Sequence, residues 1–305
     1  METSTATPAR TFDPGMSLVA ISALLFACKG TLIKYIYGLG ASVDDVMILR
    51  LLFSMPAYVW VALREWPADA GRYRLGQWLG VAVCGVIGYY VSSYLDMLGL
   101  QTVSAGLERM ILYTYPAFVV LLSAVLFRKP VSLALCACIA VIYCGLGLVF
   151  YADIQAQPRS SIAEIAVGSL YVLVCAVAFA FYVVGSEHYM KVFSSRLFTS
   201  TAMLAAGLAM GAHYAVLDAP ARLLQLSGAI YGWCAVTALL FTVIPAFMMS
   251  AGVRRIGSAK AGAVGMVGPI ATVLVAATFL GESVSAAQIA GLAIVILGVD
   301  RLRKV

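Results

Sequence analysis

Charged residues are scarce in this chain. Only 11% of its 305 residues are Asp, Glu, Lys or Arg, whereas 63% are hydrophobic. An average soluble protein has about 25% charged residues. So little charge cannot cover a surface that faces water, which excludes an ordinary soluble globular protein.

Sequence patterns that carry catalysis or nucleotide binding are also missing. The chain has no HExxH zinc-binding helix, no GxxxxGK[ST] phosphate-binding loop and no CxxC pair with metal-ligand spacing. Its seven cysteines lie inside apolar stretches, where we expect small buried hydrophobic side chains. The formal charge of +6 does not indicate nucleic-acid binding, because the basic residues sit at the ends of apolar runs. We expect no cofactor and no metal.

Long apolar runs are what the sequence has instead. A helix that crosses the roughly 30 Å hydrocarbon layer needs about 20 apolar residues. The sequence therefore predicts an all-α polytopic membrane protein with ten transmembrane helices, which leaves no room for a soluble catalytic domain. The predicted crossings lie at roughly 16–37, 45–64, 75–95, 101–127, 131–151, 163–184, 196–217, 228–250, 258–280 and 284–301.

The basic residues of the short loops indicate the orientation, because Lys and Arg are retained on the cytoplasmic side. With a cytoplasmic N-terminus, fourteen Lys and Arg residues fall in cytoplasmic segments, and only Arg159 and Arg222 fall in external loops. If one crossing were added or removed, every later loop would change sides and the Lys and Arg residues would no longer be concentrated on one side. We therefore expect both termini to be cytoplasmic and the protein to lie in the cytoplasmic membrane.

The second half of the chain repeats the first at an offset of 153 residues (252 − 99). Between 99–145 and 252–298, eleven of 47 aligned positions are identical, against roughly one in ten expected from such skewed compositions. Five crossings per half is an odd number, so the two five-helix repeats must be inverted. The predicted divisions are a cytoplasmic tail at 1–15, repeats at 16–151 and 163–301, an external loop at 152–162 and a cytoplasmic tail at 302–305.

Inverted repeats around a site near the bilayer midplane are typical of secondary transporters, because one half can rock against the other. We therefore predict a transporter that moves a small solute by alternating access. Two other classes stay open: an intramembrane enzyme, which the missing catalytic patterns disfavour, and a non-transporting scaffold or receptor, which the inverted repeat disfavours.

A shared pattern runs through GLQTVSAGLERMILYTYPAFVVLLSAVLFRKPVS (99–132) and GVRRIGSAKAGAVGMVGPIATVLVAATFLGESVS (252–285). Each segment has a helix-terminal Gly, a run of small residues, a mid-helix Pro and a charged turn. The pattern resembles the EamA-type transporters of the drug/metabolite transporter superfamily. The resemblance implies ten helices in two repeats and a substrate such as an amino acid, a sugar, a nucleotide derivative or a drug. The halves differ where Glu108-Arg109 aligns with Ala261-Gly262.

Charged side chains inside the predicted helices are candidates for the substrate site, because each costs about 2.5–3.5 kcal/mol on insertion scales. Lys29 lies deep in the first helix and Arg50 inside the second. Arg50 either serves the site or pairs with Asp44 or Asp45. Asp96 is expected at the interface, exposed to solvent.

Glu108 and Arg109 are adjacent on one helix, so their side chains point about 100° apart and we expect each to find a partner elsewhere. Glu108 either bridges to Lys29 or Arg50 and only holds helices together, or carries the coupling proton of an exchanger. Arg109 or Lys29 is expected to receive an anionic group of the substrate. Tyr113 is placed deep enough to line the site.

Positive charges outnumber negative ones in the first-half membrane region, with Lys29, Lys34, Arg50 and Arg109 against Asp96 and Glu108. This surplus of two favours an anionic or zwitterionic solute, such as an amino acid or a related metabolite, and we expect its export.

Proline recurs at matching positions of the fourth and ninth predicted helices, as Pro116 and Pro269. Each proline removes a backbone hydrogen bond, and the recurrence favours kinks that form part of a cavity and its gate. Tyr89 and Tyr90, near the end of the third helix, are expected to be interfacial anchors.

Overall fold

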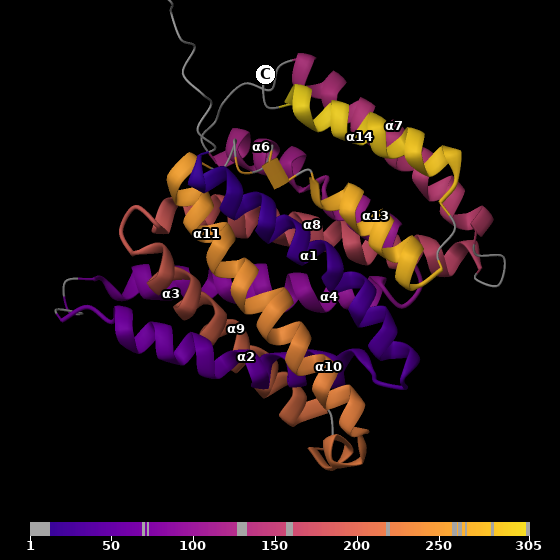
Figure 1. Cartoon of the computed structure of the whole chain (residues 1–305). Helices are drawn as coiled ribbons and strands as arrows, with labels where there is room; N and C mark the ends of the chain where they lie inside the picture. The colour runs from indigo at the N-terminus through magenta and orange to yellow at the C-terminus, as the bar shows by residue number, and fades with distance from the viewer. Residues whose placement is uncertain are drawn as a thin grey trace, which may run out of the picture.

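Apolar helices make up the described part of the chain. The computed structural model describes residues 13–68, 71, 73–126, 133–156, 161–217, 220–257, 261, 264–265, 267–281 and 284–302. Across these residues the chain is helical and contains no strand (Figure 1). The elements are α1 (Pro14–Gly38), α2 (Val43–Glu65), α3 (Leu75–Gly85), η2 (Val86–Val91), α4 (Ser92–Gly99), α5 (Ala105–Leu112), α6 (Tyr115–Leu126), α7 (Leu133–Ala156), α8 (Ile162–Tyr189), α9 (Ser195–Leu217), η3 (Pro220–Gln225), α10 (Gly228–Ala238), η4 (Leu239–Val243), α11 (Ile244–Ile256), α13 (Val267–Phe279) and α14 (Ala286–Leu302).

Seven helical stretches among the described residues are long and apolar enough to cross a membrane. The predicted crossings at 196–217, 258–280 and 284–301 correspond to α9, α13 and α14, of which α13 and α14 are 13 and 17 residues long in their described parts. The all-α prediction is confirmed, while the number of ten crossings stays a prediction. The seven stretches are Pro14–Gly38, Val43–Glu65, Leu75–Gly99, Ala105–Leu122, Cys136–Ala156, Ile162–Tyr189 and Gly228–Ile256.

Side-chain caps mark where several helices begin. Ser42 and Asp45 form a reciprocal capping box at the start of α2, and Ser161 and Glu164 form another at the start of α8. The first backbone N–H groups of a helix have no partner within the helix, and these side chains supply one.

Element positions recur at the offset found in the sequence. α3 begins at residue 75 and α10 at residue 228, and each continues into a π-helical segment, η2 from residue 86 and η4 from residue 239. The differences 228 − 75 and 239 − 86 both equal 153. π-Helical turns are rare and are frequent at functional sites. Their recurrence at one offset therefore makes η2 and η4 candidates for positions beside such a site.

Two close helix contacts recur at the same offset. A Cβ atom at Gly99 of α4 would lie 2.8 Å from the carbonyl oxygen of Gly168 on α8. Likewise, a Cβ atom at Gly252 of α11 would lie 3.1 Å from the carbonyl oxygen of Gly15 on α1. The absence of a side chain at these glycines lets the helix backbones approach closely.

α2 packs against α9. η2 packs against α9, and η4 packs against α2. α1 packs against α11 and α13, and α8 packs against α4 and α6. α7 and α14 lie side by side at one edge (Figure 1). Cys136 and Cys144 on α7 are exposed, so the expectation that all cysteines are buried is wrong for these two.

Candidate functional site

A small cavity lies between α2 and α9, at the level of the two π-helical segments. It encloses about 40 Å³, which is room for roughly three water molecules. A cavity of this size is too small to hold a metabolite. Its lining includes polar and aromatic side chains as well as Met, Leu and Ala. The lining residues are Met47, Arg50, Leu51, Ser54, Tyr58, Tyr89, Tyr90, Ser93, Met203, Ala206, Met210 and Thr242.

Arg50 is the charged side chain of this cavity. It is 7% exposed, and its Nη2 donates a hydrogen bond to Met47 Sδ at 3.2 Å. In the part of the chain that the structure describes, no carboxylate forms an ion pair with Arg50. The alternative in which Arg50 pairs with Asp44 or Asp45 is therefore wrong. Asp45 Oδ2 instead accepts a hydrogen bond from the backbone N–H of Ser42 in the capping box of α2.

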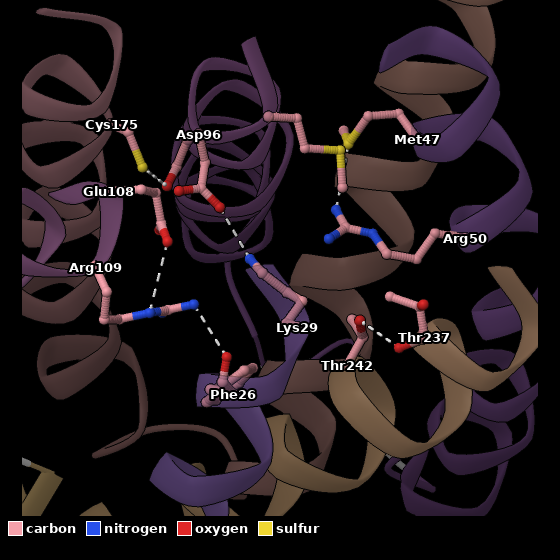
Figure 2. Close-up of polar contacts among 12 residues, drawn as sticks. Phe26, Lys29, Met47, Arg50, Asp96, Glu108, Arg109, Cys175, Thr237 and Thr242 are labelled. Atoms are coloured by element: carbon pink, nitrogen blue, oxygen red, sulfur yellow. Dashed lines mark hydrogen bonds and ion pairs between the residues drawn. The ribbon is translucent and has the colours of Figure 1, made fainter. Parts of the chain in front are cut away.

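Hydroxyl groups surround Arg50. Arg50, Ser54 and Tyr58 are four residues apart and lie on one face of α2. Tyr58 is 1% exposed, and its hydroxyl group has no hydrogen-bond partner among the described residues. Ser54 Oγ and Thr242 Oγ1 each donate to a backbone carbonyl at 3.0 Å, which leaves their oxygens able to accept (Thr242 in Figure 2).

Both halves of the chain contribute to the cavity. Arg50 and Met203 are 153 residues apart, as are Tyr89 and Thr242, and all four line it. Equivalent positions in the two halves of the chain thus carry different side chains. The positive charge comes from the first half, and its counterpart in the second half is a thioether.

A second group of charges lies beside the cavity and is held together by ion pairs (Figure 2). Lys29 Nζ on α1 lies 3.0 Å from Asp96 Oδ2 on α4, and Arg109 Nε lies 3.7 Å from Glu108 Oε2 on α5. Asp96 is only 2% exposed. The expectation that Asp96 faces solvent is wrong, because Lys29 compensates its charge inside the bundle. The expectation that Glu108 and Arg109 cannot pair is also wrong, because the long Arg109 side chain bends back to its neighbour.

The four charges, Lys29, Asp96, Glu108 and Arg109, form the buried ion cluster. The carboxyl groups of Asp96 and Glu108 lie close enough to share a hydrogen bond if one carries a proton. Glu108 is fully buried, and neither of its oxygens accepts a hydrogen bond within the described residues. Glu108 does not bridge to Lys29 or Arg50, the structural role considered for it, since the ion-pair partner of Lys29 is Asp96.

Main-chain groups complete the surroundings of the buried ion cluster. Arg109 Nη2 donates to the carbonyl oxygen of Phe26 on α1 at 3.0 Å. Gly30, one turn further along α1, leaves space for Glu108, since a Cβ atom there would lie 3.2 Å from Glu108 Oε2. The counterparts of Glu108 and Arg109 are Ala261, which is buried, and Gly262, which lies outside the described residues. The cluster therefore belongs to the first half.

Tyr113 connects the two halves instead of lining the cavity. Its hydroxyl group donates to the carbonyl oxygen of Gly265 at 2.7 Å. The backbone leaves the helical conformation at Tyr113 and Thr114, between α5 and α6. Pro116 is the second residue of α6, where a missing N–H costs no intrahelical hydrogen bond. Pro269 is a buried residue of α13.

Several lining residues were not among the predicted site residues. Ser54 and Tyr58 could have been found, because they follow Arg50 at helical spacing on α2. Thr242 could have been found only by applying the 153-residue offset to Tyr89. Tyr89 and Tyr90 face the cavity, so their interpretation as interfacial anchors is wrong.

Comparisons with known proteins agree with this architecture. The EamA-like transporter family matches residues 13–151 and again residues 166–299. The "Uncharacterized transporter YcbK" of Bacillus subtilis (strain 168) is 32% identical over 283 residues, which cover 91% of this chain and 88% of that protein. A solved structure titled only "Crystal structure of protein" superposes with a TM-score of 0.66 at 17% identity and covers 94% of both chains.

The last match concerns the fold alone, because its sequence identity is low. The family match covers nearly the whole chain and occurs once in each half, with starting points 153 residues apart (166 − 13). Together with the seven apolar helices, it identifies a multi-pass integral membrane protein that transports and is not an enzyme. The chain belongs to the EamA-like transporter family.

Proposed function

We propose that the protein is a secondary transporter that exports a small anionic or zwitterionic metabolite across the cytoplasmic membrane by alternating access. The substrate binds in the cavity between α2 and α9, and both chain termini are cytoplasmic.

Arg50 is the observation that carries this proposal. The buried ion cluster contains two cations and two carboxylates, so its charges balance. Arg50 has no ion-pair partner of its own among the described residues, although it is almost completely buried. A buried guanidinium without an ion pair is costly, and an anionic group of the substrate supplies one together with charge-assisted hydrogen bonds.

The recurrence at 153 residues supports alternating access. Each half contributes lining residues, a π-helical segment and a close glycine contact at equivalent positions. Two inverted halves of this kind can exchange conformations, so that the cavity opens to one side and then to the other.

The buried ion cluster supports protons as the coupling ion. A proton on Glu108 or Asp96 leaves one carboxylate against Lys29 and Arg109 and so changes the charge balance beside the cavity. We expect Glu108→Gln to abolish accumulation driven by a pH gradient while solute exchange at equal pH persists.

Counterflow in proteoliposomes tests the substrate class and the site. The purified protein is reconstituted and preloaded with members of a panel of organic anions, amino acids and amines, and uptake of the labelled solute is followed. Arg50→Gln should lower counterflow at least about tenfold, since charge-assisted hydrogen bonds contribute about 1.5–3 kcal/mol.

Arg196→Gln is the matched control, because Arg196 pairs with Glu65 at the exposed ends of α9 and α2. Its counterflow should equal that of the unchanged protein. A folded protein that moves only amines contradicts the proposed substrate class. Full counterflow in Arg50→Gln contradicts the cavity as the site.

A further inference from the structure

The cavity discriminates between two substrate classes that its positive charge alone leaves open. Resting on the function proposed above, we propose that the cavity selects an organic monoanion, such as a monocarboxylate with an apolar body, and rejects the zwitterionic amino acid of the same shape.

The groups that can donate hydrogen bonds in the cavity match one carboxylate. The Arg50 guanidinium has five N–H donors in a planar fork, which suits two carboxylate oxygens. Within the described residues its side chain donates one hydrogen bond, to Met47 Sδ. Tyr58 adds a buried hydroxyl group without a partner on the same face of α2. An anionic head therefore satisfies both Arg50 and Tyr58.

An ammonium group finds no equivalent partner. None of the described residues that line the cavity is an Asp or a Glu. The nearby carboxylate of Asp96 is engaged by Lys29 at 3.0 Å. The hydroxyl oxygens of Ser54 and Thr242 are neutral acceptors, and Arg50 repels a second positive charge. A zwitterion thus gains the same contacts at its carboxylate and loses the hydration of its ammonium group without replacement.

The rest of the lining favours an apolar body. Met47, Met203 and Met210 line the cavity together with Leu51. Methionine side chains are flexible and polarisable, so they can adapt to different apolar shapes when the cavity opens. The structure therefore favours selection by the charged head and tolerance toward the body of the solute.

Four probes with matched parts test this inference. 3-Phenylpropanoate carries the carboxylate and the apolar body, and phenylalanine adds an ammonium group to both. Phenethylamine has the same body with an ammonium group in place of the carboxylate, and acetate has the carboxylate without the body. Binding to the purified full-length protein in detergent is measured by calorimetry and by the ligand-dependent rise of the unfolding temperature. We expect 3-phenylpropanoate to bind at least about tenfold more tightly than phenylalanine and acetate, and phenethylamine not to bind.

Variants assign the effect to the cavity. Arg50→Gln should abolish binding of 3-phenylpropanoate, and Tyr58→Phe should weaken it several-fold with little change in folding, because only one hydroxyl group is removed. Arg196→Gln should bind like the unchanged protein. Tyr58→Phe keeps the test decisive if Arg50→Gln does not fold.

Some results would overturn the inference. These are phenylalanine binding as tightly as 3-phenylpropanoate, acetate binding equally well, binding unaffected by both cavity substitutions, or no saturable binding of any probe. Counterflow separates this inference from the proposed function. Transport of amino acids that depends on Arg50 rejects selection of a monoanion and keeps the proposed transport function. Binding of 3-phenylpropanoate without transport of any panel solute keeps the selection and rejects the transport function.

Discussion

At the scale of single residues, Lys29 and Asp96 each compensate the charge of the other inside the bundle. Lys29 is 12% exposed and Asp96 2%, and their atoms lie 3.0 Å apart. Removing one partner of a buried pair leaves an uncompensated charge, which costs about 3–5 kcal/mol, whereas replacing both by apolar residues is close to neutral.

We therefore expect Asp96→Asn to lower the unfolding temperature in detergent strongly. The double variant Lys29→Met with Asp96→Leu should recover most of the loss. Thermal unfolding followed by circular dichroism gives both values. A double variant that is as unstable as Asp96→Asn would show that the pair does not act as a unit, and Arg196→Gln at the exposed Glu65 pair controls for the loss of any surface charge.

The sequence predicted some of these residues and not others, for a physical reason. Lys29, Arg50, Glu108 and Arg109 were recognised because a charge deep in an apolar run requires a compensating partner. Asp96 was misjudged because its position along the helix says nothing about Lys29, which lies 67 residues earlier in the chain and contacts it only after the helices have packed.

At the scale of helices, glycine contacts bring α4 onto α8 and α11 onto α1. A methyl group at Gly99 or Gly252 would collide with a valine side chain, and it would press against the carbonyl oxygen of Gly168 at 2.8 Å or of Gly15 at 3.1 Å. Backbone cannot move aside as a flexible side chain can, so each helix pair would separate. Overpacking of this kind typically costs about 1–3 kcal/mol.

Gly99→Ala and Gly252→Ala should therefore destabilise the protein by similar amounts. Gly147→Ala on α7 is the control, because Gly147 is exposed and a Cβ atom there meets nothing within 4 Å. Unfolding temperatures of the three variants, measured in one detergent, provide the comparison. Equal stability of Gly99→Ala and Gly147→Ala would contradict the proposed closeness of α4 and α8.

Helix positions followed from the sequence, but interruptions within them did not. Apolar runs predicted the segments near 75–95 and 228–250, because length and hydropathy suffice for that. The π-helical turns η2 and η4 lie within these segments. They change the backbone hydrogen bonding and not the hydropathy, so the apolar runs did not predict them. The break at Tyr113 and Thr114 likewise lies before Pro116, not at it.

At the scale of the whole molecule, inversion makes a prediction that a parallel repeat does not share. If the two halves are inverted, positions 153 residues apart lie on opposite sides of the membrane. Leu39 and Val192 (39 + 153) are 38% and 40% exposed at helix ends, and Gly76 and Ala229 are also an exposed pair. From the loop charges we expect Leu39 and Ala229 outside, and Gly76 and Val192 in the cytoplasm.

Single cysteines at these four positions, introduced into a variant without the seven native cysteines, report the side directly. In intact cells a membrane-impermeant maleimide should label Leu39→Cys and Ala229→Cys. Gly76→Cys and Val192→Cys should react only after permeabilisation, which also shows that they are folded and accessible. Labelling of both members of one pair from the same side would reject the inversion and, with it, exchange between two equivalent inverted halves as the mechanism of transport.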